Sequence, residues 1–452
     1  MKYYNNILEL IGNTPLVKIN KLAKESKGLV LAKLESMNPG GSVKDRIGIN
    51  MIEAAEKDGT LKPGGTIVEA TSGNTGIGIA LAACVKGYKC IFVMTDKAAP
   101  EKKYYLQALG ADVIVKPVSA RADSPEHYVN TARRIHEETP NSIFIYQYFN
   151  TANPMSHYAT TGPEIWEDTE GKITHFVAGI GTGGTISGTA KYLKEKNPNI
   201  KIIGADPYGS IFKGLKETGK IPDAVPYLVE GIGQDVLPGN VWLEYVDEVI
   251  NVSDIDSINM CRVMSKEEGI FSGASSGTIA YAALEYAKKL KEDDVMVFIV
   301  CDTGERYLSK YHSDEWMREK RMLDTAFTDV GTVFKTRKLK DTPELVTISG
   351  TELVSDALYL MDQYNLSTLP VFENGQCIGS LNEATLLNKL VEDRYVASKR
   401  INEVMDEKLP TLDSHENIMK AVAELKEKPA VLVSEYGHIA GILTKYDVLD
   451  FV

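Results

Sequence analysis

Lys44 lies in a stretch of small residues, Asn38-Pro39-Gly40-Gly41-Ser42-Val43-Lys44, and two more glycine-bearing loops follow it in the chain. A lysine amine that is kept neutral can bond to an aldehyde and can later carry a proton. Its pKa must fall for this, through burial or through a nearby cation, and Arg46 is a candidate neighbour. Without this context, the same lysine would be interpreted as a solvated surface residue.

The second loop, Thr71-Ser72-Gly73-Asn74-Thr75-Gly76, follows a strand-like run and precedes a helical pattern. A helix N-terminus presents free N–H groups and a partial positive charge, so an anion fits there. A carboxylate is the anion expected at this loop. The alternative is an ordinary strand-to-helix turn that is capped by Ser or Thr.

The third loop, Gly181-Thr182-Gly183-Gly184-Thr185, stands in the same kind of position. Its glycines allow close backbone approach and its threonines add hydroxyl donors, which suits a phosphate. No Gly-Lys-Ser/Thr ends it, so it is not a Walker loop. Further on, the hydroxyl of Thr303 follows the last apolar run and could bond a ring nitrogen, although a simple helix cap is an equal alternative.

A reactive lysine, a carboxylate loop and a phosphate loop are together what an enzyme that uses pyridoxal phosphate needs. Each of the three motifs would be weak evidence alone. In this order they predict such an enzyme.

The amino-acid composition limits which partners the protein can bind and where in the cell it is expected. The chain has 452 residues, 43% of them hydrophobic, and a net charge of −12, which argues against binding to nucleic acid or to anionic membranes. No apolar run is long enough to span a bilayer, and no secretory signal is evident. The five cysteines form no Cys-x-x-Cys pair, and the seven histidines form no metal-ligand spacing. We therefore expect a cytoplasmic protein without a metal site.

Short apolar runs alternate with amphipathic stretches in the first part of the chain, over residues 1–320. This alternation predicts an α/β fold with two parallel-sheet subdomains covered by helices. The expected strands are Leu29–Lys33, Thr66–Glu69, Cys90–Met94, Val113–Lys116, Ser142–Tyr146, His175–Ala178, Lys201–Ala205 and Val295–Cys301. The expected helices include Gly78–Val85, Tyr104–Leu109, Val129–Glu138 and Thr185–Glu195.

The alternation of apolar and amphipathic runs ends after residue 320. Residues 321–344 are charged and suit a linker or a connecting helix. Two related α+β units follow, 345–393 and 401–452, and a tandem repeat of this kind usually packs one copy on the other.

From Ile11-Gly12-Asn13-Thr14-Pro15 to about Trp316, the chain resembles the pyridoxal-phosphate β-family of fold type II, which holds cysteine synthase and cystathionine β-synthase. The resemblance implies that Lys44 is the lysine that bonds to the cofactor. It implies a substrate-carboxylate loop at Thr71, Ser72, Gly73, Asn74 and Thr75, with Asn74 also bonding the ring hydroxyl of the cofactor. Gly181, Thr182, Gly183, Gly184 and Thr185 would hold the phosphate, and Thr303 would face the ring nitrogen.

Details favour the cystathionine β-synthase branch. Gln147-Tyr148 resembles its Gln-Tyr pair among the substrate-binding residues, and Glu230 stands where cysteine synthases tend to carry Gln. The tail units resemble the paired domains of a Bateman module. Thr444 and Asp447 match the motif that holds an adenosyl ribose, whereas the equivalent run of the first unit, Gly379 to Thr385, lacks both residue types at the matching places. An adenosyl ligand, or a purely structural module that forms dimers, is implied.

The expected reaction is β-replacement that condenses serine with homocysteine to cystathionine. The alternatives are a cysteine synthase that uses O-acetylserine and sulfide, a serine or threonine dehydratase, and a nucleotide-sensing protein with an inactive catalytic half. The resemblance also implies a homodimer or a higher homo-oligomer. No haem is expected, because the chain starts almost directly at the catalytic segment.

Overall fold

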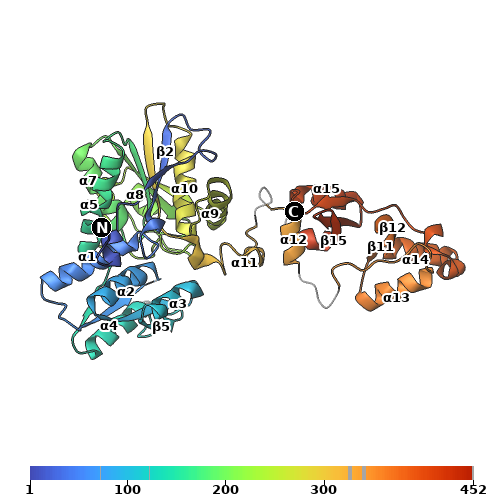
Figure 1. Ribbon diagram of the computed structural model, residues 1–452, viewed down its shortest axis with the longest axis horizontal. Coiled ribbons are helices and arrows are strands. Elements are labelled where there is room, and N and C mark those ends of the chain that lie inside the picture. Colours follow the sequence, from blue (N-terminus) through green and yellow to red (C-terminus); the bar gives the residue numbers. More distant parts are fainter. Residues whose placement is uncertain (72, 122, 324–327, 338–342, 450–452) are drawn as a thin grey trace. The chain divides into compact units, whose positions relative to one another are not determined.

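The computed structural model describes residues 1–71, 73–121, 123–323, 328–337 and 343–449 (Figure 1). The chain divides into two compact units, residues 1–313 and 314–452. The first unit holds two sheets and the second holds the two smaller α+β copies.

The larger sheet of the first unit has the order β1-β2-β10-β7-β8-β9, and among its described strands only β1 is antiparallel to its neighbour. Helices α9 and α10 pack on one face, and α6, α7 and α8 pack on the other. Because both faces are covered, β10 is apolar along its whole length. The bounds are β1 (Leu16–Lys18), β2 (Leu29–Leu34), β7 (His175–Gly179), β8 (Lys201–Pro207), β9 (Glu248–Val252), β10 (Val295–Val300), α6 (Thr161–Asp168), α7 (Gly184–Lys196), α8 (Phe212–Thr218), α9 (Asp254–Glu268) and α10 (Ala274–Ala287).

The smaller sheet of this unit is parallel throughout its described strands, in the order β5-β4-β3-β6. Helices α1, α2 and α3 share an apolar core with one face, and α4 packs on the other (Figure 1). The bounds are β3 (Thr66–Ala70), β4 (Lys89–Thr95), β5 (Asp112–Lys116), β6 (Ser142–Phe144), α1 (Lys44–Lys57), α2 (Asn74–Lys86), α3 (Pro100–Ala108), α4 (Tyr128–Glu138) and α5 (Ala152–Ala159).

The second unit contains two similar copies. In the first copy α13, β11, β12 and α14 follow one another, and in the second β13, α15, β14, β15 and α16 do so. Helix α12 belongs to the core of the second copy, because Val330, Val333 and Phe334 pack with Leu443 and Val448. The bounds are α11 (Asp314–Glu319), α12 (Val330–Thr336), α13 (Val354–Tyr364), β11 (Thr368–Glu373), β12 (Gln376–Asn382), α14 (Glu383–Glu392), β13 (Thr411–Asp413), α15 (Ile418–Glu427), β14 (Ala430–Glu435), β15 (His438–Thr444) and α16 (Lys445–Val448).

The predicted fold class is confirmed: two largely parallel sheets covered by helices, followed by a tandem α+β pair. Two strands end earlier than expected: the run expected over Ser142–Tyr146 ends at Phe144, and the run expected over Val295–Cys301 ends at Val300. Tyr146 has a φ of 54°, which lies outside the strand region, and its N–H is donated to the buried carboxylate of Glu69 at 2.7 Å. Strand β1 was not predicted, since three residues carry too little pattern.

Candidate active site

Lys44 is the first residue of α1, and close helix packing fixes its position. Helices α1 and α2 cross at Gly48 and Gly78, where a Cβ on either glycine would clash with the backbone of the other helix. Just before Lys44, the Val43 N–H donates to the Cys301 carbonyl at 2.8 Å, which ties the start of α1 to the end of β10. The packing role of the two glycines is a tertiary property that the sequence does not reveal.

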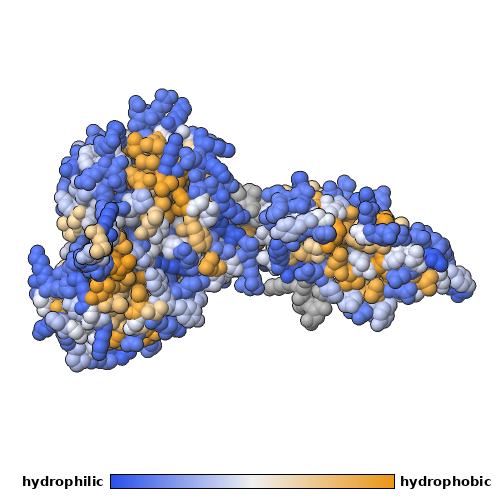
Figure 2. Space-filling view, in the orientation of Figure 1, coloured by the Kyte–Doolittle hydropathy of each residue, from blue (hydrophilic) through white to orange (hydrophobic). Residues whose placement is uncertain are grey.

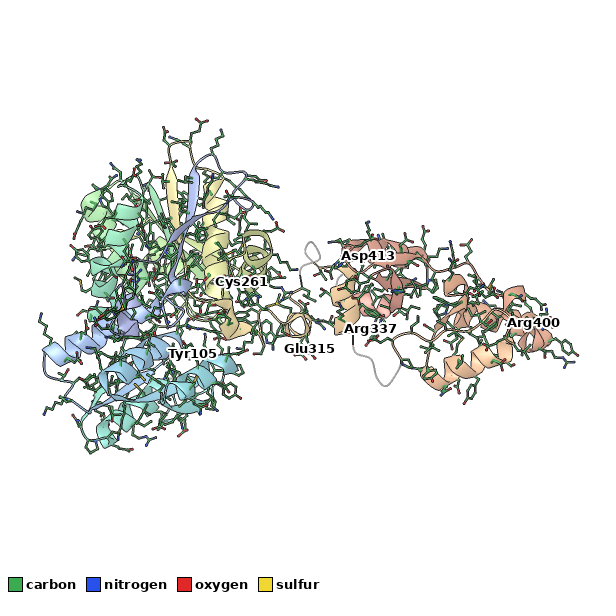
Figure 3. All side chains as sticks on the ribbon, in the orientation of Figure 1. Tyr105, Cys261, Glu315, Arg337, Arg400 and Asp413 are labelled. Carbon is green, nitrogen blue, oxygen red and sulfur yellow. The ribbon has the colours of Figure 1, made fainter. Side chains whose placement is uncertain are left out.

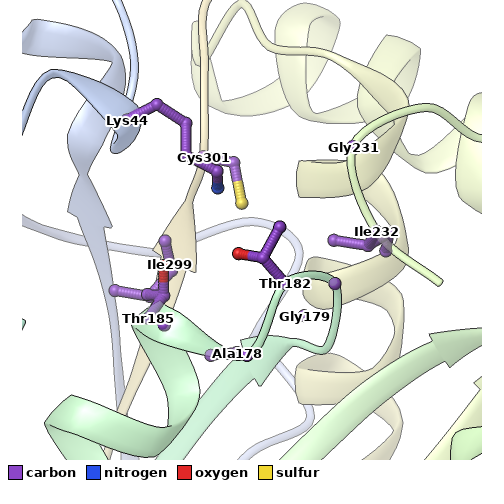
Figure 4. A pocket seen from close by; sticks show the side chains of 12 residues that line it. Lys44, Ala178, Gly179, Thr182, Thr185, Gly231, Ile232, Ile299 and Cys301 are labelled. Atoms are coloured by element: carbon purple, nitrogen blue, oxygen red, sulfur yellow. The ribbon is translucent and has the colours of Figure 1, made fainter. Parts of the chain in front are cut away.

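A cavity joins Lys44 to the loop Gly181–Thr185 (Figure 4). The amine of Lys44 and the thiol of Cys301 point into the same space, with the hydroxyl of Thr182 across from them. Burial is the main cause that lowers the pKa of Lys44, while acidic neighbours such as Asp302 oppose it. A lowered pKa favours the neutral amine that the predicted chemistry requires. Burial also raises the pKa of Cys301 to about 12, so this thiol keeps its proton at neutral pH.

The loop Gly181–Thr185 runs from β7 into the N-terminus of α7, and all five of its residues line the cavity. Gly183 has a φ of 93°, which favours glycine. A Cβ on Gly184 would overlap Oδ1 of Asn153, so the backbone here lies directly against a neighbouring side chain. Asn153 Nδ2 also donates to the hydroxyl of Thr182 at 3.2 Å. The free N–H groups of the first turn therefore open on a narrow, preformed cradle.

His157 lies behind this cradle and was not predicted. Its Nε2 is 3.3 Å from the Thr185 hydroxyl and its Nδ1 is 2.9 Å from that of Thr161. Burial first, and then Arg46 and Lys44, hold the pKa of His157 well below its ordinary value. A neutral imidazole thus orients one of the loop hydroxyls. No sequence signal marks this histidine.

The loop Thr71–Thr75 ends at the N-terminus of α2, and Ser72 lies outside the described residues. Gly73 has a φ of 125°. The Thr75 hydroxyl donates to Gln147 Oε1 at 2.7 Å, so Gln147 lies against this loop. Tyr148 instead places its hydroxyl 3.2 Å from that of Tyr128.

The hydroxyl of Thr303 donates to the carboxylate of Glu305, two residues further along the chain. Ser275, near the start of α10, is a hydroxyl that was not predicted from the sequence. It is 3% exposed and hydrogen-bonds to Cys301. The signal that could have found it is Gly273-Ala274-Ser275-Ser276-Gly277, a further glycine-bearing loop before a helix.

A buried charged cluster flanks Gly231 and Ile232, which line the cavity. Glu230 accepts from Lys102 at 2.8 Å and from Lys310 at 2.7 Å, and both Glu230 and Lys102 are almost completely buried. Burial alone would raise the pKa of Glu230, but the two lysines lower it below its usual value. Together these three side chains carry a net positive charge.

These features fit pyridoxal phosphate. The N-terminus of α7 supplies the phosphate cradle, and the glycines of its loop leave room that side chains would fill. Lys44, whose pKa is lowered, faces the same cavity. Among the described residues, no group of three or more His, Cys, Asp or Glu could hold a metal ion. Nor does any described helix combine the length and apolar character that a bilayer crossing requires.

Residues 7–302 match the family described as pyridoxal-phosphate dependent enzyme, and residues 338–392 and 401–452 match the CBS domain. This chain belongs to the pyridoxal-phosphate-dependent enzyme family. It is 37% identical to a cystathionine beta-synthase of Dictyostelium discoideum, over 99% of this chain and 92% of that protein. It is 43% identical to a cysteine synthase of Staphylococcus aureus, over 68% of this chain and 96% of that protein.

A solved structure is similar as well. The O-acetylserine dependent cystathionine beta-synthase from Helicobacter pylori matches with a TM-score of 0.63 at 38% identity, over 69% of this chain and 99% of that chain. The family, the fold type II architecture and the tandem CBS domains predicted from the sequence are thereby confirmed. The chain is a pyridoxal-phosphate-dependent enzyme of the β-family that resembles cystathionine β-synthase.

Proposed function

We propose that this enzyme condenses L-serine with L-homocysteine to cystathionine by β-replacement. The observation that carries the choice of thiol is the buried cluster of Glu230, Lys102 and Lys310 beside the cavity. Homocysteine brings a second amino-acid head group, with one ammonium and one carboxylate. The cluster offers a carboxylate and two ammonium groups for it, and sulfide would need neither.

The cofactor supplies an aldehyde that bonds the substrate amine and a ring that takes up electrons from the substrate α-carbon. The chain supplies the proton transfers. Lys44 Nζ takes the α-proton, and it returns a proton after the thiolate sulfur has added to the β-carbon. Its lowered pKa suits both steps, because a base works best when its pKa lies near the working pH.

The remaining site residues bind and orient. Thr71, Ser72, Gly73, Asn74 and Thr75, with Gln147 and Tyr148, would hold the substrate carboxylate. Gly181, Thr182, Gly183, Gly184 and Thr185 would hold the cofactor phosphate. For the ring nitrogen, Thr303 and Ser275 are rival candidates, and the burial of Ser275 next to Cys301 favours Ser275. The Lys102 ammonium is a proton donor within the cluster for the serine hydroxyl, which leaves poorly unless it is protonated.

Steady-state rates with serine or O-acetylserine, each against homocysteine or sulfide, test the substrate pair. We expect the highest kcat/KM for serine with homocysteine. Glu230→Gln should raise KM for homocysteine while changing KM for sulfide little. A highest kcat/KM for O-acetylserine with sulfide, unaffected by Glu230→Gln, would make the chain a cysteine synthase instead.

We also propose a division into a catalytic domain at 1–320, a linker at 321–344 and two CBS domains at 345–393 and 401–452. The second CBS domain would bind an adenosyl ligand through Thr444 and Asp447. Asp447 Oδ2 accepts from both the N–H and the hydroxyl of Thr444 at 2.7 Å, so the pair is preformed at the start of α16. Calorimetric titration of the full chain with S-adenosylmethionine should show binding that Asp447→Asn removes. Binding that survives this change would place the ligand elsewhere.

A cytoplasmic homodimer is proposed as well. Large apolar side chains are exposed on the first unit, among them Tyr3, Tyr4, Ile7 and Leu10, and Figure 2 shows apolar patches on its visible face. Exposed apolar area of this kind marks association surfaces. Light scattering at low protein concentration would measure the mass, and a monomer would contradict the proposal.

A further inference from the structure

Asn74 is clamped by two charged side chains from the segment that follows β10. Its Nδ2 donates to Asp302 Oδ2 at 2.7 Å, and its Oδ1 accepts from Arg306 Nη1 at 2.6 Å. Asn74 is the first residue of α2, whereas Asp302 and Arg306 are 228 and 232 positions further along the chain. The sequence alone gave no reason to assign either charged residue a role.

The two charges decide which way the amide points. A carboxylate only accepts hydrogen bonds and a guanidinium only donates them. A flipped amide would set its N–H group against Arg306 and its oxygen against Asp302, so both contacts would become repulsive. Hydrogen bonds to charged groups are also stronger than neutral ones, which makes this orientation the stable one.

Both charged side chains are themselves held in place. Asp302 is fully buried, and its Oδ2 also accepts from the Tyr307 hydroxyl at 2.6 Å. Arg306 is 3% exposed and donates to the Gly40 carbonyl, in the loop that leads to Lys44. Its guanidinium lies 5.7 Å from the centre of the ring of Tyr105, which Figure 3 labels on α3. Arg306 thus connects Asn74 with the segment that positions the reactive lysine.

We propose that Asp302 and Arg306 are positioning residues that aim Asn74 at the ring hydroxyl of the cofactor. The Nδ2 group of Asn74 has two hydrogens, and one of them is donated in the hydrogen bond to Asp302. The other stays free to donate to the ring oxygen, and the clamp keeps a donor, rather than an acceptor, in that place. This inference rests on the cofactor-binding role proposed for Asn74.

A double-mutant cycle on the loaded enzyme tests the inference. The variants are Asn74→Ala, Arg306→Gln and the double substitution, and the readout is the visible absorption spectrum per mole of bound cofactor, beside kcat/KM. Each single change should move the absorption band and lower kcat/KM by about tenfold to a hundredfold, because small displacements of aligned groups cost that much. The double variant should resemble Asn74→Ala alone, since the two residues act through one contact. Arg306→Lys should restore part of the spectrum.

Several outcomes would overturn the inference. If Arg306→Gln and Asp302→Asn lower stability or cofactor content but leave the spectrum of the bound cofactor unchanged, the two residues only support the fold. Fully additive effects in the double variant would have the same meaning. An unchanged spectrum in Asn74→Ala would instead remove the role proposed for Asn74, and the inference with it. Asp302→Asn serves in place of Arg306→Gln if the latter does not fold.

The matched control is an exposed arginine of α4. Arg134 pairs with Glu138 one helical turn further on, at 3.2 Å, and more than half of its side chain is open to solvent. Arg134→Gln therefore removes the same charge far from the clamp and should change neither the spectrum nor kcat/KM.

Discussion

Glu69 carries a completely buried carboxyl group near the end of β3, two residues before the loop Thr71–Thr75. It accepts from the backbone N–H groups of Tyr146 at 2.7 Å and Gln147 at 3.3 Å. Through these contacts it holds the turn that carries Gln147 to the Thr75 hydroxyl. Burial raises the pKa of Glu69 to about 8, from an ordinary value of 4.5.

This raised pKa predicts a pH-dependent stability. A group whose folded-state pKa is raised contributes stability below its ordinary pKa, and that contribution is lost as the pH rises through the folded-state value, at about 1.4 kcal/mol for each pH unit between the two values. The window is therefore pH 4.5 to about 8. When the pH is raised from about 5 to about 9, the melting temperature of Glu69→Gln should fall less than that of the unchanged protein. The exposed Glu138→Gln is the control, and equal pH slopes for all three proteins would contradict the prediction.

Residues that lie in local motifs were predictable, and those that depend on tertiary contacts were not. Lys44 and Gly181 to Thr185 sit in short runs whose composition indicates their chemistry, whereas Gln147 was assigned only from the family resemblance. His157 and Arg306 come to the site through packing between distant segments, and nothing near them in the sequence marks that contact. Thr303 was assigned from its position after a strand and from the family resemblance, and that assignment stays a prediction.

At the scale of elements, α7 and the loop before it should control how tightly the cofactor is held. Gly184→Ala adds a methyl group that overlaps Oδ1 of Asn153, so the loop must move. We expect cofactor affinity to fall by at least about tenfold, the cost of roughly 1.4 kcal/mol of lost phosphate contacts. Titration of the cofactor-free protein with pyridoxal phosphate, followed by absorbance, would measure it.

Gly87→Ala is the control for this substitution. Gly87 has a φ of 80° and an added Cβ would meet nothing within 4 Å, so the change costs backbone strain alone. It should lower the melting temperature slightly and leave cofactor affinity unaltered. Equal affinities for Gly184→Ala and the unchanged protein would contradict the role given to the loop.

The elements themselves were largely evident from the alternation of apolar and amphipathic runs. The expected helix Thr185–Glu195 is α7, and the expected strand Lys201–Ala205 is the greater part of β8. Strand β9 was missed because polar residues interrupt it. The packing of α12 with the core of the second CBS copy could not be read from its charged surroundings.

At the scale of the whole molecule, the sequence separates a catalytic part from a tail of two CBS domains, and the comparisons agree. The match to the Helicobacter pylori enzyme covers 99% of that chain but only 69% of the present chain. A catalytic unit of this family therefore exists without the tail. Substrate preference was not predictable at this scale, since the relatives include both a cystathionine beta-synthase and a cysteine synthase. We propose that this preference depends on a few side chains near the cavity, such as Glu230.

The measurement that tests the account most directly is to locate the covalent bond between protein and cofactor. The purified enzyme, loaded with pyridoxal phosphate, is reduced with borohydride, digested and mapped by mass spectrometry. We predict a single modified site at Lys44, and its loss in Lys44→Ala, which should keep its fold by circular dichroism and show no turnover. The exposed Lys57→Ala, at the other end of α1, should retain both the label and the activity. A label on another lysine, or a fully active Lys44→Ala protein, would contradict the account.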